Sequence, residues 1–209
     1  MKINEIFYSI QGEAKWTGLP NIFIRTTGCN LRCSYCDTKY AYEDGKEMSV
    51  QEITKHIAGY PCKHVCITGG EPLLQEETID LVKNLLKKDY KICIETNGSI
   101  SLEKIPENKD IMVSLDIKSP SSKMEDKMIL GNIKLLKQKD QLKIVIKDRE
   151  DYNYAKKIIQ KYRPSCDIYF QPVWGTNPKK LAKWITTDGL NVKLGLQIHK
   201  ILWGNKRGV

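Results

Sequence analysis

The chain lacks the features that would place it in a membrane or outside the cell. No apolar run approaches the roughly 20 residues that a membrane-spanning helix needs. The N-terminus shows no secretory leader and runs directly into a β-prone segment, residues 2–10. The seven cysteines are an odd number, which does not suggest a framework of paired disulfides. We therefore expect a cytoplasmic protein with reduced thiols and no membrane partner.

The chain also lacks linkers, internal repeats and low-complexity stretches, so nothing in it divides 209 residues into two units. That length allows a real hydrophobic core. It falls short of the roughly 250 residues of a complete eight-unit β/α barrel. We expect a single domain, residues 1–209, that forms part of a barrel.

Apolar strand patterns alternate with amphipathic helix patterns from residue 21 onward. A capping box, Ser49 followed by Glu52, marks the start of one helix. Alternation of this kind predicts right-handed βαβ units, a parallel sheet and an incomplete (β/α)6 barrel of the TIM type. Strands are expected at 21–26, 64–68, 91–95, 111–117, 141–146, 167–170 and 192–198, and further helices at 77–88, 124–137, 151–162 and 178–186.

Positive charge exceeds negative charge. The chain has 34 Lys and Arg residues against 25 Asp and Glu residues, a formal net charge of +9. Such a balance can indicate binding to nucleic acid, tRNA being one alternative. The lysines are scattered over helices and loops, which favours a solvated surface, and we expect no direct contact with nucleic acid.

Three thiols lie within eight residues, at Cys29, Cys33 and Cys36, with the spacing C-x3-C-x2-C. Clustered thiolates suit an iron–sulfur centre or zinc. Three thiolates would leave one iron of a 4Fe–4S cluster without a protein ligand, so that it can chelate the amino and carboxylate groups of S-adenosylmethionine. A zinc loop with a distant fourth ligand is the alternative, although zinc knuckles usually pair two C-x2-C units.

Polar and glycine-rich segments follow the predicted strands. They include Gly69-Gly-Glu-Pro72, Glu95-Thr-Asn-Gly98, 116–118 and 171–174. In parallel α/β folds the active site lies at the carboxyl ends of the strands. These segments and the cysteine loop are therefore expected to share one mouth of the barrel.

The cysteine spacing and the Gly-Gly-Glu-Pro segment resemble the radical S-adenosylmethionine (radical SAM) superfamily. Gln11-Gly-Glu13, Arg25, Cys36-Asp-Thr38 and the ending Trp203-Gly-Asn-Lys-Arg-Gly-Val209 make the whole chain resemble the 7-carboxy-7-deazaguanine synthase family. The resemblance implies a lyase that contracts the ring of 6-carboxy-5,6,7,8-tetrahydropterin and releases ammonia, a step towards queuosine and other 7-deazapurines. It also implies S-adenosylmethionine, a 4Fe–4S cluster and Mg²⁺, an electron donor such as flavodoxin or ferredoxin, and a homodimer.

The resemblance assigns roles residue by residue, with no catalytic acid or base among them. Cys29, Cys33 and Cys36 match the cluster ligands, and Thr38 matches a magnesium ligand. Positions that match cofactor contacts are Tyr35, Cys36, Asp37, Gly70, Glu71, Ser114, Asp116, Lys118, Gln171, Pro172, Val173 and Trp174. Positions that match substrate contacts are Ile10, Gln11, Gly12, Arg25, Thr68, His199 and Val209, the last through its carboxylate.

Two other functions stay open at this point. A radical SAM activase, which makes a glycyl radical on a partner enzyme, would share the cluster spacing. A metal or electron-transfer module would hold a cluster without cleaving S-adenosylmethionine. The remaining cysteines, at positions 62, 66, 93 and 166, are interpreted as small buried hydrophobic residues, with a second metal site as the less favoured alternative.

Overall fold

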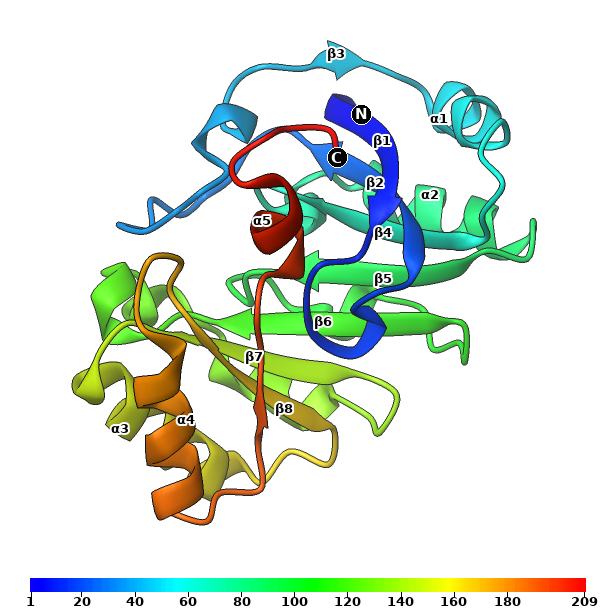
Figure 1. Ribbon diagram of the computed structural model, residues 1–209. Helices are drawn as coiled ribbons and strands as arrows, with labels where there is room; N and C mark the ends of the chain where they lie inside the picture. The colour runs from blue at the N-terminus through cyan, green and yellow to red at the C-terminus, as the bar shows by residue number, and fades with distance from the viewer.

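A computed structural model describes residues 1–209 as one nine-stranded sheet, in the order β3-β1-β2-β4-β5-β6-β7-β8-β9 (Figure 1). The seven strands β2, β4, β5, β6, β7, β8 and β9 pair in parallel, and β1 is antiparallel to both β2 and β3. The sheet does not close, which confirms the incomplete barrel. The strands are β1 (Lys2–Ile10), β2 (Pro20–Thr26), β3 (Lys46–Glu47), β4 (His64–Gly69), β5 (Lys91–Thr96), β6 (Ile111–Ile117), β7 (Gln141–Ile146), β8 (Asp167–Pro172) and β9 (Lys193–Leu194).

Helices cover the outer face of the sheet. They are α1 (Val50–Ile57), α2 (Glu77–Leu86), α3 (Arg149–Tyr162) and α4 (Pro178–Thr187). The capping box of α1 is present, since the Ser49 side chain accepts from the backbone of Glu52 and the Glu52 side chain accepts from the backbone of Ser49. One core cluster joins β2, β4 and β5 to α1 and α2, and a second joins β6, β7 and β8 to α3 and α4.

Alternation along the strands separates this core from the inside of the barrel. On β2, Ile22 and Ile24 belong to the outer core, while Phe23 packs in a separate inner cluster with Cys66, Cys93 and Met112. Side chains two residues further along each strand therefore point into the barrel above this inner layer. This geometry brings polar residues from successive strands together.

The C-terminal segment crosses the inner side of the barrel. Helix α5 (Ile198–Trp203) and the tail after it lie in front of the sheet and end near β1 (Figure 1). The backbone N–H of Ile198 donates to the carbonyl of Gly12, and Arg207 donates to Asn4. These contacts tie the C-terminal segment to the N-terminal strand and loop.

The helix expected at 124–137 is wrong. The segment forms two short 3-10 turns, Glu125–Lys127 and Leu130–Leu135. Asn132 explains the change, because its buried side chain accepts from the backbone N–H of Leu102 and donates to the carbonyls of Gly98 and Ile100. These bonds tie the segment to the loop after β5 and override its helical pattern.

The strand expected at 192–198 is shorter than predicted. Only Lys193–Leu194 pairs with β8, and Ile198 starts helix α5. The Ile198 backbone bond to Gly12 draws the chain off the sheet edge and across the barrel. His199, expected directly after that strand, therefore lies on a helix.

Candidate active site

A cavity of about 710 Å³ opens at the carboxyl ends of the parallel strands. Every residue predicted to bind the cluster, magnesium, cofactor or substrate lines it, except Glu71. The fold thus brings predicted segments that lie far apart in the chain together around one cavity. The predicted residues in the wall are Ile10, Gln11, Gly12, Arg25, Cys29, Cys33, Tyr35, Cys36, Asp37, Thr38, Thr68, Gly70, Ser114, Asp116, Lys118, Gln171, Pro172, Val173, Trp174, His199 and Val209.

The cysteine loop forms one wall of the cavity. Cys29, Cys33 and Cys36 are free thiols, and they are the cysteines that line it. The Cys29 sulfur accepts from the backbone N–H of Leu31 at 3.4 Å and from the Asn97 amide at 3.7 Å. Burial raises the pKa of Cys29 and of Cys33.

The Gly69-Gly70 pair lets the loop after β4 pass close to the cysteine loop. A Cβ atom on Gly70 would lie 2.0 Å from the Gly28 carbonyl oxygen, and one on Gly69 would lie 2.3 Å from the Thr26 carbonyl oxygen. Gly69 also has a φ of +140°. Backbone N–H groups of Gly70 and Glu71 donate to Thr26 and Gly28 across this contact. The two glycines therefore position the cysteine loop.

Glu71 was expected to bind the amino group of the cofactor, and the structure places it elsewhere. Its side chain is fully buried and does not line the cavity. Its carboxylate accepts from the backbone N–H groups of Leu73 and Asn97 and from the Thr96 hydroxyl. Burial raises the pKa of Glu71 to about 7 despite these hydrogen bonds. Glu71 therefore holds the loops after β4 and β5 together.

Glu71→Gln is expected to lower the free energy of unfolding at pH 6 by about 2 kcal/mol, because the amide NH2 would face N–H and O–H donors. At this pH the raised pKa of Glu71 leaves most of the carboxyl uncharged, so the change removes little buried charge. Urea unfolding at pH 6 measures the change. Glu76→Gln is the matched control. Glu76 is exposed and its side chain caps no helix, so this change should shift stability by less than about 0.5 kcal/mol. Equal stabilities for the two variants would contradict the bracing role.

Buried ion pairs cross the centre of the cavity. Lys143 lies 2.6 Å from Glu13 and 3.6 Å from Asp116, and Lys118 lies 2.9 Å from Asp116. Burial alone would raise the pKa of Glu13, but Lys143 lowers it to about 2. Burial would lower the pKa values of both lysines, but the neighbouring carboxylates raise them. Glu13 and both lysines are therefore charged at neutral pH.

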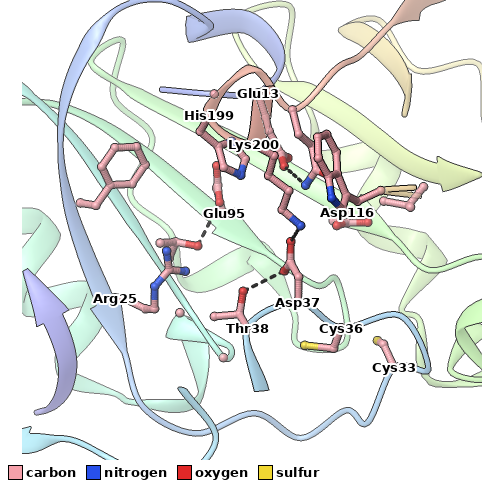
Figure 2. Close-up of a pocket in the computed structure, with 18 of the residues that line it drawn as sticks. Glu13, Arg25, Cys33, Cys36, Asp37, Thr38, Glu95, Asp116, His199 and Lys200 are labelled. Atoms are coloured by element: carbon pink, nitrogen blue, oxygen red, sulfur yellow. Dashed lines mark hydrogen bonds and ion pairs between the residues drawn. The ribbon is translucent and has the colours of Figure 1, made fainter. Parts of the chain in front are cut away.

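Arg25 and Glu95 form a second polar group, across the cavity from Asp116 (Figure 2). The Arg25 Nε atom donates to Glu5 at 2.7 Å, while its terminal amino groups donate to no protein acceptor. Glu95 accepts from Gln11 at 3.2 Å and from Thr68 at 2.9 Å. Glu95 is the one carboxylate side chain in the wall with no cationic side chain within 4.0 Å.

Thr38 and Asp37 lie at the mouth of the cavity, where Lys200 closes over them (Figure 2). The Thr38 hydroxyl donates to Asp37 at 2.9 Å, and the Lys200 ammonium pairs with the other carboxylate oxygen. Desolvation would raise the pKa of Asp37, but the hydrogen bond from Lys200 lowers it to about 2. Two oxygen atoms of the kind that bind hard metal ions are thus adjacent here, the Thr38 hydroxyl and an Asp37 carboxylate oxygen.

His199 lies directly over Gly12. A Cβ atom on Gly12 would lie 2.0 Å from the His199 Nδ1 atom, so only glycine fits beneath the ring. Burial lowers the pKa of His199 although Glu13 and Asp37 oppose the shift. The imidazole is therefore neutral at pH 7.

Seven charged residues in the wall had no role assigned from the sequence: Glu5, Glu13, Glu95, Lys143, Lys200, Lys206 and Arg207. Glu13 and Glu95 stand in segments that the sequence had singled out, next to Gln11-Gly12 and at the end of a strand. Lys143 interrupts an apolar strand at an inward position, and this is the signal that could have found it. Lys200 follows His199 directly.

Three of the predicted cofactor-binding residues carry buried polar atoms without a hydrogen-bond partner. They are the Tyr35 hydroxyl, Asp116 Oδ1 and Gln171 Oε1. Buried polar atoms are nearly always satisfied in native proteins. These atoms therefore indicate a place for a polar ligand in this part of the cavity.

Comparisons with known proteins agree with this geometry. Residues 23–164 match the radical SAM superfamily. The chain is 40% identical over 209 residues to the 7-carboxy-7-deazaguanine synthase of Thermoplasma acidophilum, covering 100% of both chains. It is 42% identical over 219 residues to the synthase of that name from Clostridium acetobutylicum, covering 100% of this chain and 99% of the relative. The chain belongs to the 7-carboxy-7-deazaguanine synthase family of radical SAM enzymes.

The crystal structure of QueE from Escherichia coli has the same fold. It aligns with a TM-score of 0.77 at 24% identity, over 94% of this chain and 93% of that one. As a family member, this radical SAM enzyme is a lyase, and membership implies a 4Fe–4S cluster and S-adenosylmethionine. The three cavity thiols, with N–H donors on Cys29, are a donor set that fits such a cluster. No helix of the chain combines the length and the apolar character that crossing a membrane requires.

Proposed function

We propose that the chain converts 6-carboxy-5,6,7,8-tetrahydropterin to 7-carboxy-7-deazaguanine with release of ammonia. Cys29, Cys33 and Cys36 would hold the cluster. When bound, the cluster and S-adenosylmethionine supply the radical chemistry, and the protein supplies geometry and a water-excluding cavity. The observation that carries the proposal is that the cysteine loop and the Arg25–Glu95 side face the same cavity.

The residues around the unpartnered atoms support a cofactor site. Lys118 and Asp116 present opposite charges that suit the amino and carboxylate groups of S-adenosylmethionine. Tyr35, Asp116 and Gln171 each offer a buried polar atom that a ligand would satisfy. We assign to the cofactor Tyr35, Asp37, Gly70, Ser114, Asp116, Lys118 and the segment Gln171, Pro172, Val173, Trp174.

The opposite wall supports a substrate that combines a carboxylate with N–H groups. Arg25 offers its terminal amino groups to the carboxylate. Glu95, free of any ion pair, can accept from N–H groups on the heterocycle, and Gln11 and Thr68 hold it in place. We assign to the substrate Ile10, Gln11, Gly12, Arg25, Thr68, His199 and Val209, and add Glu95.

The direct test is product formation. Protein reconstituted with iron and sulfide and then reduced should turn over the pterin in the presence of S-adenosylmethionine and Mg²⁺, and mass spectrometry should detect 7-carboxy-7-deazaguanine. Failure to form this product would overturn the proposal. Cleavage of S-adenosylmethionine without turnover of pterin would favour a glycyl-radical activase, and no cleavage at all would favour an electron carrier.

Thr38 and Asp37 support the proposed Mg²⁺ dependence, because Mg²⁺ prefers oxygen ligands and often bridges to an anionic ligand. Thr38→Ala is expected to lower the rate at limiting Mg²⁺ by at least about tenfold. Cluster absorbance and iron content should not change. Rates measured across a Mg²⁺ titration check this. Thr186→Ala, at an exposed position of α4, is the control. An identical Mg²⁺ response in both variants would mean that Thr38 does not bind the metal.

Two partners complete the proposal. An electron donor such as flavodoxin or ferredoxin would reduce the cluster, and the enzyme would act as a homodimer in the cytoplasm. Sedimentation of the reconstituted protein tests the second point, and reduction assays with each donor test the first.

A further inference from the structure

A second group of metal-ligating side chains lies beneath the cavity, apart from the cysteine loop. Cys66 on β4 and Cys93 on β5 are register partners on neighbouring strands, and both point to the inner face of the sheet. Glu95 lies two residues beyond Cys93, on the same face. One ligand atom from each of the three residues lies within 4.8 Å of the other two.

The surroundings of this group differ from those of ordinary buried cysteines. Two cysteines in an apolar core would be simple small hydrophobic residues. Here the Gln11 amide lies 3.6 Å from the Cys66 sulfur and 3.2 Å from Glu95. Cys66 and Cys93 are 0% and 1% exposed, so a carboxylate lies against two buried thiols.

Glu95 also lacks a cationic partner. No Lys, Arg or His side chain lies within 4.0 Å of its carboxylate, although every other carboxylate side chain in the wall has one. Glu95 is partly buried, and a carboxylate withdrawn from water is stabilised by a cation, while thiolates select soft or borderline cations. Two sulfurs and one oxygen are a ligand set that Zn²⁺ accepts.

We propose that Cys66, Cys93 and Glu95 bind a thiophilic divalent cation, Zn²⁺ being the natural example, at the floor of the cavity. In a tetrahedral zinc site with Zn–S bonds of about 2.3 Å, two sulfurs lie about 3.8 Å apart. Side chains already within 4.8 Å need to close by no more than about 1 Å. The Gln11 amide lies between these three side chains and the cavity, so the fourth ligand position of the metal faces the cavity.

Occupation of this site changes the wall above it. The cation takes the Glu95 carboxylate and displaces the Gln11 amide that bonds to it. Both residues belong to the substrate wall, so bound Zn²⁺ weakens pterin binding without touching the cysteine loop. This consequence rests on the proposed function, whereas the metal site itself does not.

Cadmium titration of the full-length chain tests the site, because Cd²⁺ bound to thiolates gives a sulfur-to-metal absorption band. The parent protein for every variant in this test carries Cys29→Ala, Cys33→Ala and Cys36→Ala, so the cysteine loop cannot bind Cd²⁺. One Cd²⁺ per chain is expected. Cys66→Ala and Cys93→Ala should each abolish the band, while Cys62→Ala and Cys166→Ala, which remove the other two cysteines, should leave it unchanged.

Glu95→Gln guards against loss of folding, since it keeps both buried thiols in the inner layer. It is expected to raise the Kd for Cd²⁺ at least tenfold, with an unchanged far-ultraviolet circular dichroism spectrum. No Cd²⁺ uptake by the folded parent, or a band that survives in Cys66→Ala or Cys93→Ala, would overturn the site. Cd²⁺ uptake with no effect of Zn²⁺ on pterin binding to the wild-type enzyme would overturn only the competition.

Discussion

Replacing Cys33 with alanine is expected to lower the rate of S-adenosylmethionine cleavage by at least about 1,000-fold, which corresponds to about 4 kcal/mol. Only three cysteines line the cavity, and each would be needed to hold a cluster that leaves one iron for the cofactor. A chain with two thiols cannot retain that arrangement. Alanine is preferred to serine because a serine oxygen could replace the sulfur as a ligand. Formation of 5′-deoxyadenosine and iron content per chain provide the two measurements.

Cys166→Ala is the matched control for this change. Cys33 and Cys166 are 9% and 8% exposed, so the two substitutions remove similar amounts of buried side chain. Cys166 belongs to the outer core next to β8 and does not line the cavity. The control should keep its iron and its activity. Substantial cleavage by Cys33→Ala, or an equal loss in Cys166→Ala, would show that the loop does not act as a cluster ligand.

The fold could be predicted from the sequence because its signals are local. Each parallel strand is a short apolar run, and a polar or glycine-rich segment marks its carboxyl end. The errors arose where tertiary contacts decide the structure. Asn132 draws the 124–137 segment into bonds with the preceding loop, and the bond from Ile198 to Gly12 draws the chain off the sheet after β9. Neither contact leaves a pattern in the sequence near it.

The composition of the cavity wall could be predicted for the same reason. Residues at the ends of neighbouring parallel strands meet at one edge of the sheet, so segments singled out one by one arrive in one place. Glu71 shows the limit of this reasoning. Its position after β4 is correct, but whether a carboxylate faces a ligand or the N–H groups of the next loop depends on its rotamer, which sequence spacing does not determine.

The ion pairs inside the barrel could not be predicted from the sequence. The pair of Lys143 and Glu13 joins residues 130 positions apart and becomes visible only when the loop after β1 is placed across β7. Buried charges of this kind are costly unless paired. The structure therefore explains why a lysine can occupy an inward position in the middle of an apolar strand.

Replacing Arg25 with glutamine is expected to raise the KM for the pterin about 100-fold, equivalent to about 3 kcal/mol, because a charge-assisted pair with the substrate carboxylate is lost in a desolvated wall. Glu5 fixes the guanidinium through its Nε atom at 2.7 Å and leaves the two terminal amino groups for the ligand. Binding of S-adenosylmethionine should not change, since Arg25 lies across the cavity from Asp116, one of the residues assigned to the cofactor (Figure 2). Steady-state kinetics and cofactor binding measured separately distinguish the two effects.

A pterin without the 6-carboxylate makes this test specific, since it completes a double-mutant cycle. Wild-type protein should bind the truncated pterin about as weakly as Arg25→Gln binds the full substrate, and the variant should lose little more when both groups are absent. Arg149→Gln is the control, because Arg149 lies over Tyr152 and Trp184 on the outer side of the barrel. Additive losses would mean that Arg25 stabilises the wall without contacting the carboxylate. In that case another cation of the cavity would have to bind the substrate carboxylate. Lys143 and Lys200 are two such cations, and each already pairs with a carboxylate of the protein.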